Sequence, residues 1–344
     1  MRDSPYPDQA RYVSRVCAQL GLTFSDLDYG RGYLFSVTDG SSTLVTGAGQ
    51  ICTYPLNSAA AFGISVDKAH TNTVLSRSGI PVIPSRLYFI TETHAKLRPS
   101  DQAMSDALAA VSTTALPVFC KPNSGSRGDF AELIYSVPQF REYLDRVRCR
   151  YNTILIQPVI SGTEYRIFCV NDTPVFYAKK AEFCLTGDGA ANLGALIREQ
   201  NERLFGYGIS LMNLSSMMEY LIAEHNYSSE FIPALGQKIV LPGRRNLSAG
   251  TEVAAFSTEV PTALARLAGR AMAAVGLRVS GVDIFDVSPG NDLSDLVVIE
   301  VNGNPSISSL SRLGRDDVID HIWRTVLTSY FSEQSCIREI RKCK

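Results

Sequence analysis

Three oxygen-bearing side chains near the C-terminal end have the types and spacing of metal ligands. Glu300 and Asn302 stand two residues apart in the β-branched run 296–301, and because alternate residues of a strand share a face, both point the same way. The preceding run 281–285 can pair antiparallel with this strand and offer Asp283 to the same face. Oxygen ligands of this kind suit Mg²⁺, which binds one or two carboxylates together with nucleotide phosphates and water.

A plainer interpretation of the same hairpin is a sheet edge that carries polar groups. Against it, an acidic residue within a run of Val and Ile has a desolvation cost. Asp286 is the competing carboxylate on the first strand. It lies three residues from Asp283, hence on the opposite face, and we expect it to be solvated.

A second group with chemical potential is the loop 120–128, in which a lysine at a strand end precedes two glycines and two serines. Glycines let the backbone approach phosphate oxygens, and exposed N–H groups bind anions. The candidate phosphate-binding residues are Lys121, Ser124, Gly125 and Ser126. The loop is not a Walker A motif, since no Gly-Lys-Ser/Thr follows the glycines. Taken by itself, it also fits a flexible surface loop.

Composition narrows the classes of function. The 33 basic residues nearly balance the 34 acidic ones, so neither nucleic acid nor an anionic membrane is expected as a partner. The opening residues lack an apolar secretory core, and no stretch approaches the roughly 20 apolar residues of a membrane span. We therefore expect a cytoplasmic protein. The eight cysteines are scattered and are expected to be reduced, and the four histidines form no recognisable triad motif.

The elements that must position these residues are predicted from periodicity and turn residues. Helices are predicted over 9–20, 67–78, 101–111, 262–275 and 316–331, and strands over 33–37, 42–45, 82–90, 117–120, 131–135, 154–156, 165–170, 175–183, 282–287 and 296–301. This alternation indicates a mixed α+β and α/β protein. We divide it into a small N-terminal domain (1–64), a central domain (65–150) and a last part (151–344), with lid strands over 115–180, a catalytic core over 181–315 and a closing helix over 316–344.

Five segments make a resemblance specific. Ser65-Val-Asp-Lys68, the Lys121 loop, Gln157 to Glu164, Gly281-Val-Asp283 and Glu300-Val-Asn302 occur in the order and spacing of the ATP-grasp ligases. Within that superfamily the chain most resembles the cyanophycin-synthetase-like and glutathione-synthetase-like ligases, on the runs 186–201 and 244–250, and the dipeptide-forming ligases of natural-product pathways. It departs from the D-alanine:D-alanine ligases, which have an arginine where this chain has Gly281.

The resemblance implies a fold of two α+β subdomains that grip ATP between them, preceded by a small α/β domain. It assigns the phosphates to Lys68, Lys121 and Lys179, with Lys180 as a near rival of the last. The hinge Gln157, Pro158, Val159 and Ile160 would read adenine through the Pro158 carbonyl and the Ile160 amide, and Glu164 would accept the ribose hydroxyls. Asp283, Glu300 and Asn302 match the metal ligands, and Arg244, Arg245 and Asn246 match the loop that steadies the acyl phosphate.

The implied activity is the ATP-dependent joining of a carboxylic acid to an amine through an acyl phosphate, with two Mg²⁺ ions, or Mn²⁺, and with amino acids or a small peptide as substrates. Two alternatives stay open: a non-catalytic ATP-binding regulatory module, and an ATP-grasp enzyme of another reaction type. Relatives are often dimers, so a homodimer is possible.

Overall fold

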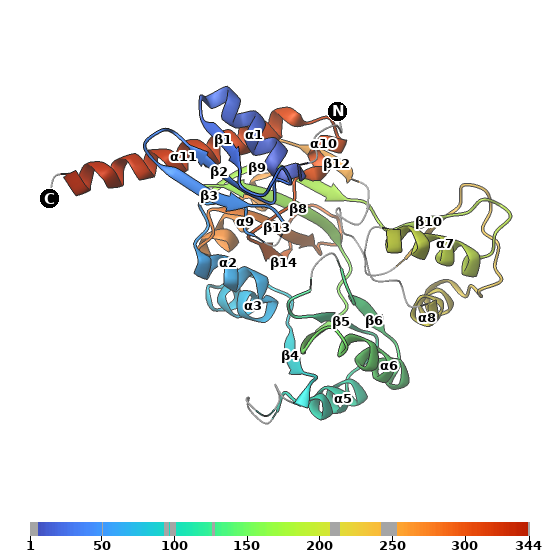
Figure 1. The fold of residues 1–344 in the computed structure, drawn as a ribbon. Coiled ribbons are helices and arrows are strands. Elements are labelled where there is room, and N and C mark those ends of the chain that lie inside the picture. Colours follow the sequence, from blue (N-terminus) through green and yellow to red (C-terminus); the bar gives the residue numbers. More distant parts are fainter. Residues whose placement is uncertain are drawn as a thin grey trace.

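The computed structural model describes residues 6–49, 51–92, 96, 101–125, 128–206, 214–241 and 253–342. Within these ranges the strands form antiparallel sheets of three, four, five and two strands, with helices against them (Figure 1). Two α+β units, each built on an antiparallel sheet, follow a small unit of one helix and three strands. The predicted fold class is confirmed.

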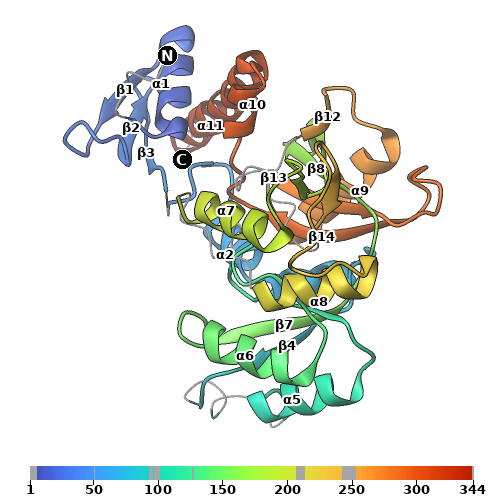
Figure 2. The same cartoon turned by 90° about the vertical axis from the view of Figure 1, so that its right-hand side faces the viewer.

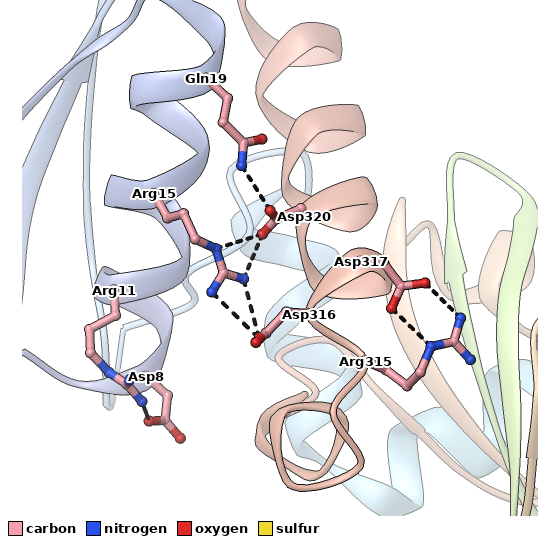
Figure 3. A network of polar contacts seen from close by, with 8 residues as sticks. All are labelled: Asp8, Arg11, Arg15, Gln19, Arg315, Asp316, Asp317 and Asp320. Carbon is pink, nitrogen blue, oxygen red and sulfur yellow. Dashed lines mark hydrogen bonds and ion pairs between the residues drawn. The ribbon is translucent and has the colours of Figure 1, made fainter. Parts of the chain in front are cut away.

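The small leading unit consists of α1 (Asp8–Leu20) and the sheet β1-β2-β3 (Thr23–Asp26, Leu34–Thr38 and Thr43–Gly47). The apolar face of α1 is buried, and Gly21 ends the helix in the left-handed conformation, which glycine adopts without strain. Figure 3 shows how α1 is joined to the C-terminal helix α11 (Asp316–Lys342): Arg15 and Gln19 both donate to Asp320, each at 2.8 Å. The first and last helices are therefore neighbours.

The largest sheet has the order β12-β9-β8-β13-β14. Its strands are β8 (Thr163–Val170), β9 (Thr173–Lys180), β12 (Val253–Ser257), β13 (Val279–Asp286) and β14 (Leu296–Asn302). One face packs on α9 (Thr262–Val275), α2 (Ala59–Val66) and α3 (Lys68–Arg77). The other face is apolar at one end, where Phe168, Phe176 and Val279 join the core shared by α1 and α11. The rest of that face carries the polar residues discussed below.

The second unit is the sheet β4-β7-β5-β6 with two helices on one face. Its elements are β4 (Arg86–Phe89), α5 (Met104–Thr113), β5 (Val118–Pro122), β6 (Glu132–Ile134), α6 (Val137–Val147) and β7 (Thr153–Pro158). We call this unit, residues 86–158, the small lobe; it lies below the large sheet in Figure 1. The chain enters it beside β14, where Val298 N donates to Pro81 O at 2.9 Å, and leaves it through residues 159–162.

A third group of elements lies to one side of both sheets (Figure 1). It contains the hairpin of β10 (Cys184–Thr186) and β11 (Lys238–Val240), with α7 (Leu193–Gly206) and α8 (Leu214–His225) around a separate apolar core. In Figure 2, α8 lies above the small lobe. The short helix α10 (Ser308–Arg312) precedes α11. Among the residues that the structure describes, none of the helices combines the length and apolarity that a membrane crossing requires.

Candidate nucleotide and metal site

One face of the large sheet holds a group of charged side chains. Strand alternation explains it: Tyr165 and Ile167 of β8, Val282 and Ile284 of β13, and Val301 of β14 pack in the core beneath α9, so the residues between them point to the opposite face. The group consists of Glu164, Arg166, Lys180, Asp283, Glu300 and Asn302, and we call it the charged face. All six come from four adjacent strands, β9-β8-β13-β14.

Asp283 is the centre of the charged face and is paired on both sides. In the strand register it lies opposite Arg166 of β8 and Glu300 of β14. Arg166 donates from Nε to Oδ1 at 2.5 Å and from Nη2 to Oδ2 at 2.6 Å, and Lys180 Nζ lies 3.4 Å from Oδ1. Burial by itself would raise the pKa of Asp283, but Arg166 and Lys180 hold the pKa below its usual value. The carboxylate is therefore ionised at neutral pH.

Glu300 reaches the rim of the site. Its side chain is 29% exposed, and Oε1 lies 4.0 Å from Lys68 Nζ. It also lines a pocket between α3 and β14, together with Lys68, Thr71 and Val82. Asn302 Oδ1 accepts the Asn304 amide at 2.9 Å. The predicted metal ligands thus share one face, with two carboxylates on directly paired strands.

The donor chemistry of these residues fits Mg²⁺. Two carboxylates and one amide oxygen are hard ligands of the type that Mg²⁺ uses beside phosphates and water. Arg166 bonds both Asp283 oxygens, and Lys180 also lies against Oδ1, so a metal ion would use the second lone pair of Oδ2. Groups of three or more His, Cys, Asp or Glu side chains with metal-site geometry do not occur in the described part of the chain, so a metal here would depend on Asn302 and on oxygens from the nucleotide.

Lys121 enters the site from the small lobe. It is 8% exposed, and burial lowers its pKa from 10.5 to about 8. Glu300 acts in the opposite direction more strongly than any other neighbour, whereas Lys68 lowers the pKa further; Glu164 and Asp283 also raise it. These electrostatic effects are short-ranged in salt, so Lys121 lies close to the charged face even though it belongs to another sheet.

The start of α3 is tied to the loop that follows Lys121. Asn123 accepts the Lys68 amide through its carbonyl at 3.2 Å and the Ala69 amide through Oδ1 at 2.8 Å. The Lys68 side chain donates to the carbonyl of Gly125. Ser124 is exposed, and Ser126 lies outside the described residues. Lys68 and Lys121, two of the three predicted phosphate lysines, are therefore brought together by contacts between α3 and the small lobe.

The net charge of the site favours an anion. Four cationic side chains, those of Lys68, Lys121, Arg166 and Lys180, surround three carboxylates, those of Glu164, Asp283 and Glu300. Two of the cations are nearly fully buried, and a buried cation in excess over its partners attracts an anionic ligand. A polyphosphate held between the two sheets would supply that charge.

The predicted adenine hinge forms the link between the sheets. Gln157 is 4% exposed and lies opposite Phe119 in the β5–β7 pairing, while Pro158 lies opposite Val118 at the end of β7. Val159 is 40% exposed, and Ile160 is partly exposed. Since the chain passes here from the small lobe to β8, backbone groups of this segment border the space between the sheets.

Two predictions need correction. Lys179 lies opposite Tyr165, on the face that packs against α9, whereas Lys180 bonds Glu164 on the charged face; the choice of Lys179 over Lys180 does not fit this placement. Asp286 was expected to be solvated, but it is fully buried. It accepts hydrogen bonds from the Ser288 amide, the Ser288 hydroxyl and the Leu293 amide, which turn the β13–β14 connection and satisfy the carboxylate.

Glu164 and the arginine loop complete the predicted residues. Glu164 is 8% exposed and accepts a hydrogen bond from Lys180, so its proposed ribose contact would be shared with that lysine. Arg244, Arg245 and Asn246 lie outside the described residues. Sequence reasoning missed Arg166, although a signal was present: it stands two residues after Glu164 in a strand and so shares its face.

Comparison with known proteins places this geometry in context. No protein-family model matches the chain. It is 33% identical over 162 residues, 45% of its length, to a glutathione biosynthesis bifunctional protein of Desulfotalea psychrophila. It is 24% identical over 252 residues, 70% of its length, to the cyanophycin synthetase of Geminocystis herdmanii. These matches confirm the predicted resemblance to glutathione-synthetase-like and cyanophycin-synthetase-like enzymes.

The chain covers less than a third of the length of each of these two relatives. The chain spans 21% of the Desulfotalea protein and 28% of the Geminocystis protein. Among solved structures, a D-alanine–D-alanine ligase from Bacillus anthracis is 16% identical, with a TM-score of 0.48 over 80% of this chain and 72% of the ligase. The substrates that these names imply are those of the relatives themselves.

Proposed function

We propose that the chain is an ATP-dependent carboxylate–amine ligase that forms an amide bond through an acyl phosphate. The observation that carries this proposal is the pairing of Asp283 with Glu300 on adjacent strands, with the buried Lys121 of the other sheet beside them. Such an arrangement combines oxygen ligands for a divalent ion with cations for phosphate groups. Binding and transfer of a phosphoryl group is the chemistry that these residues support best.

The phosphate contacts are proposed for lysines of three elements. Lys68 at the start of α3 is hydrogen-bonded to the loop that follows Lys121 of β5, and Lys180 takes the place first given to Lys179. We assign adenine to Gln157 through Ile160. Pro158 lacks an N–H and offers only its carbonyl, which suits the amino group of adenine, and Glu164 would receive the ribose hydroxyls.

We assign Asp283, Glu300 and Asn302 to two Mg²⁺ ions, with Mn²⁺ as a possible substitute. Bound there, the ions would neutralise charge on the β- and γ-phosphates. The protein's own contribution is positional: the rigid strand pairing fixes both carboxylates, and the lysines hold the phosphates in line for attack.

The proposed reaction has two steps that balance without a protein nucleophile. A carboxylate oxygen of the substrate attacks the γ-phosphorus, the bond to the β-phosphate oxygen breaks, and ADP leaves with that electron pair. An amine then attacks the carbonyl carbon of the acyl phosphate, loses a proton, and expels inorganic phosphate. Arg244 is proposed to steady the oxyanion, because a guanidinium can bind two oxygens at once.

Amino acids or a small peptide are the proposed substrates. The support is the similarity to proteins named for glutathione biosynthesis and cyanophycin synthesis, together with the resemblance to dipeptide-forming ligases of natural-product pathways. The part of each relative that the chain does not cover leaves the substrate pair to experiment.

A substrate screen tests the proposal directly. The purified protein is incubated with ATP, Mg²⁺ and pairs of the common amino acids, and phosphate release and product mass are followed. A ligase releases phosphate only when an acid and an amine are both present, and it yields a product with the mass of the two minus water. ATP binding without such turnover across the panel would favour a regulatory module and would reject the ligase.

A further inference from the structure

Arg166 is a charged residue in the centre of the site that has a free end. Two of its three guanidinium nitrogens, Nε and Nη2, are bonded to Asp283. The third, Nη1, has no hydrogen bond or ion pair with any residue that the structure describes. The side chain is 20% exposed, so ligands can reach it.

The position of Nη1 follows from Gly281. A β-carbon added at Gly281 would lie 2.9 Å from Pro305 Cβ, 3.1 Å from Arg166 Cδ and 3.4 Å from Arg166 Nη1. The arginine therefore lies in the space that any larger residue at position 281 would fill. Because Gly281 is paired with Asn302, Nη1 lies on the same stretch of the charged face as Asn302 and Glu300.

The energetics favour a ligand at this nitrogen. A guanidinium is charged at every relevant pH, and Asp283 and Glu300 raise its pKa further despite burial. A partly exposed N–H donor of a charged group can exchange water for an anionic acceptor, which makes a charge-assisted hydrogen bond. The fork on Asp283 also fixes the direction of the remaining N–H groups, which is the preorganisation that binding a phosphoryl group requires.

We propose that Arg166 binds the phosphoryl group that is transferred, through Nη1, and that Gly281 leaves room for this arginine. The inference rests on the proposed function, since it needs a nucleotide whose terminal phosphate lies beside Asp283 and Asn302. Arg166 is held in place by a predicted metal ligand, and it therefore reaches the phosphate that the same ligand serves. The contact supplements Lys68, Lys121 and Lys180.

The experiment compares nucleotides that differ only in their phosphates. Affinities for AMP-PNP, ADP and AMP are measured in Mg²⁺ by calorimetry for the parent, Arg166→Met, Arg166→Lys and Gly281→Ala. A charge-assisted hydrogen bond of this type corresponds to roughly a tenfold to hundredfold change in affinity. We expect Arg166→Met to weaken AMP-PNP by that factor, ADP by at most about threefold, and AMP not at all. Arg166→Lys should restore part of the loss, and Gly281→Ala should cause a smaller loss in the same order of nucleotides, because the added β-carbon shifts the arginine by a few tenths of an ångström.

Arg315→Met is the matched control. Arg315 makes the same two bonds to Asp317, from Nε at 2.9 Å and from Nη2 at 2.7 Å (Figure 3), but it stands just before α11 and packs over the ring of Phe256 in β12. Its replacement should change none of the three affinities. Thermal unfolding of each variant shows whether the fold is retained.

Three results would overturn the inference. AMP-PNP affinity unchanged in a folded Arg166→Met protein would remove the contact. Equal losses for AMP-PNP and ADP would move it to the β-phosphate, and equal losses for all three nucleotides would leave Arg166 with only a structural role. If the parent itself binds no nucleotide, the proposed function fails; if the parent binds and the variants bind equally well, only the role of Arg166 fails.

Discussion

The charged face shows how much of a site can follow from residue spacing. Glu300 and Asn302 were predicted to share a face with Asp283, and the strand register places Asp283 opposite Glu300 and Gly281 opposite Asn302. This succeeded because a strand has a period of two residues, which fixes facing without knowledge of the fold. The spacing could not decide between Lys179 and Lys180, for a related reason. Adjacent residues point to opposite faces, and only the pairing with β8 shows which face is occupied by the site.

A substitution at Glu300 tests the metal assignment. Glu300→Gln keeps the size of the side chain but removes the charge that a divalent ion requires, so we expect turnover to fall by at least about a hundredfold. The measurement is substrate-dependent phosphate release, with unfolding followed in parallel. Glu259→Gln, an exposed glutamate before α9, is the matched control and should behave like the parent. Near-normal turnover in Glu300→Gln would refute the metal assignment.

Lys121 gives the site a pH dependence. Burial lowers its pKa from 10.5 to about 8, so in the free protein it loses its charge as the pH rises through about 8. We expect ATP affinity to fall above that pH, approaching tenfold per pH unit, because the charged form binds the phosphates. Isothermal titration between pH 6.5 and 9.5 measures it, and Lys121→Arg should move the fall to higher pH, since arginine stays charged. Adenosine, which has no phosphates, should show no such fall.

The lowered pKa of Lys121 also affects the free energy of unfolding, and its effect is opposite to the effect on ATP affinity. Between about pH 8 and pH 10.5 the unfolded chain binds the proton that folded Lys121 has lost, so this group makes the free energy of unfolding rise with pH in that window. A parent protein whose ATP affinity is constant up to pH 9.5 would show that Lys121 does not contact the phosphates.

Elements with strong periodicity were predicted well, and others were not. The helix α9 was predicted with its observed bounds, 262–275, because its apolar residues recur on one face and Gly276 ends it. The helix α2 was missed because AAAFGISV is almost uniformly apolar and has no polar face. The helix α6 was missed, although the sequence carries signals for it: the N-cap Ser136, Pro138 in the first turn, and apolar residues at positions 140, 143, 144 and 147. Contacts between the sheets could not be predicted, because they depend on residues far apart in the chain.

The connection between β7 and β8 depends on a glycine. A β-carbon at Gly162 would lie 2.4 Å from the carbonyl oxygen of Asp286, a backbone atom that cannot move aside cheaply. We expect Gly162→Ala to lower the free energy of unfolding by about 1–3 kcal/mol and to weaken ATP binding, since the connection carries the predicted adenine hinge. Chemical denaturation and calorimetry measure the two effects.

Gly63→Ala in α2 is the control for that substitution. Nothing lies within 4 Å of its added β-carbon, and alanine favours a helix over glycine by roughly 0.5–1 kcal/mol. This variant should be as stable as the parent or more so. Equal stability of Gly162→Ala and Gly63→Ala would mean that the connection is not tightly packed against β13.

At the scale of the whole molecule, the leading unit is not separate from the rest. A single apolar core contains Val16 of α1, Phe35 of β2, Phe168 of β8 and Trp323 of α11. Tyr54 stacks on Trp323 with ring centres 5.0 Å apart. The boundary proposed at residue 64 therefore divides the sequence but not this core, and we expect the leading unit and the large sheet to unfold together.

The single tryptophan makes that expectation measurable. Trp323 is 1% exposed and is the only tryptophan in the chain, so its fluorescence reports on this junction alone. Its transition in denaturant should coincide with the loss of secondary structure followed by circular dichroism. Trp323→Ala should remove about 3–5 kcal/mol of stability, and Trp323→Phe less. A fluorescence transition that precedes the circular dichroism transition would show that the leading unit unfolds independently.

Two chain crossings that lie near each other join the small lobe to the large sheet, in addition to the hydrogen bonds of Asn123 with the start of α3. The first crossing is hydrogen-bonded to Val298 of β14, and the second passes the backbone of Asp286 in β13. The two points are close, because Val298 is opposite Ile284, which is two residues from Asp286. Two nearby crossings favour a rotation of the lobe about the line that joins them, and such a rotation would have to break the hydrogen bonds between Asn123 and the start of α3. A base bound at Gln157 to Ile160 would lie next to that axis and would move little. The parts of the small lobe that are far from the axis would move most. Under the proposed function, a lobe that opens in this way would release ADP while the contacts at the axis change least.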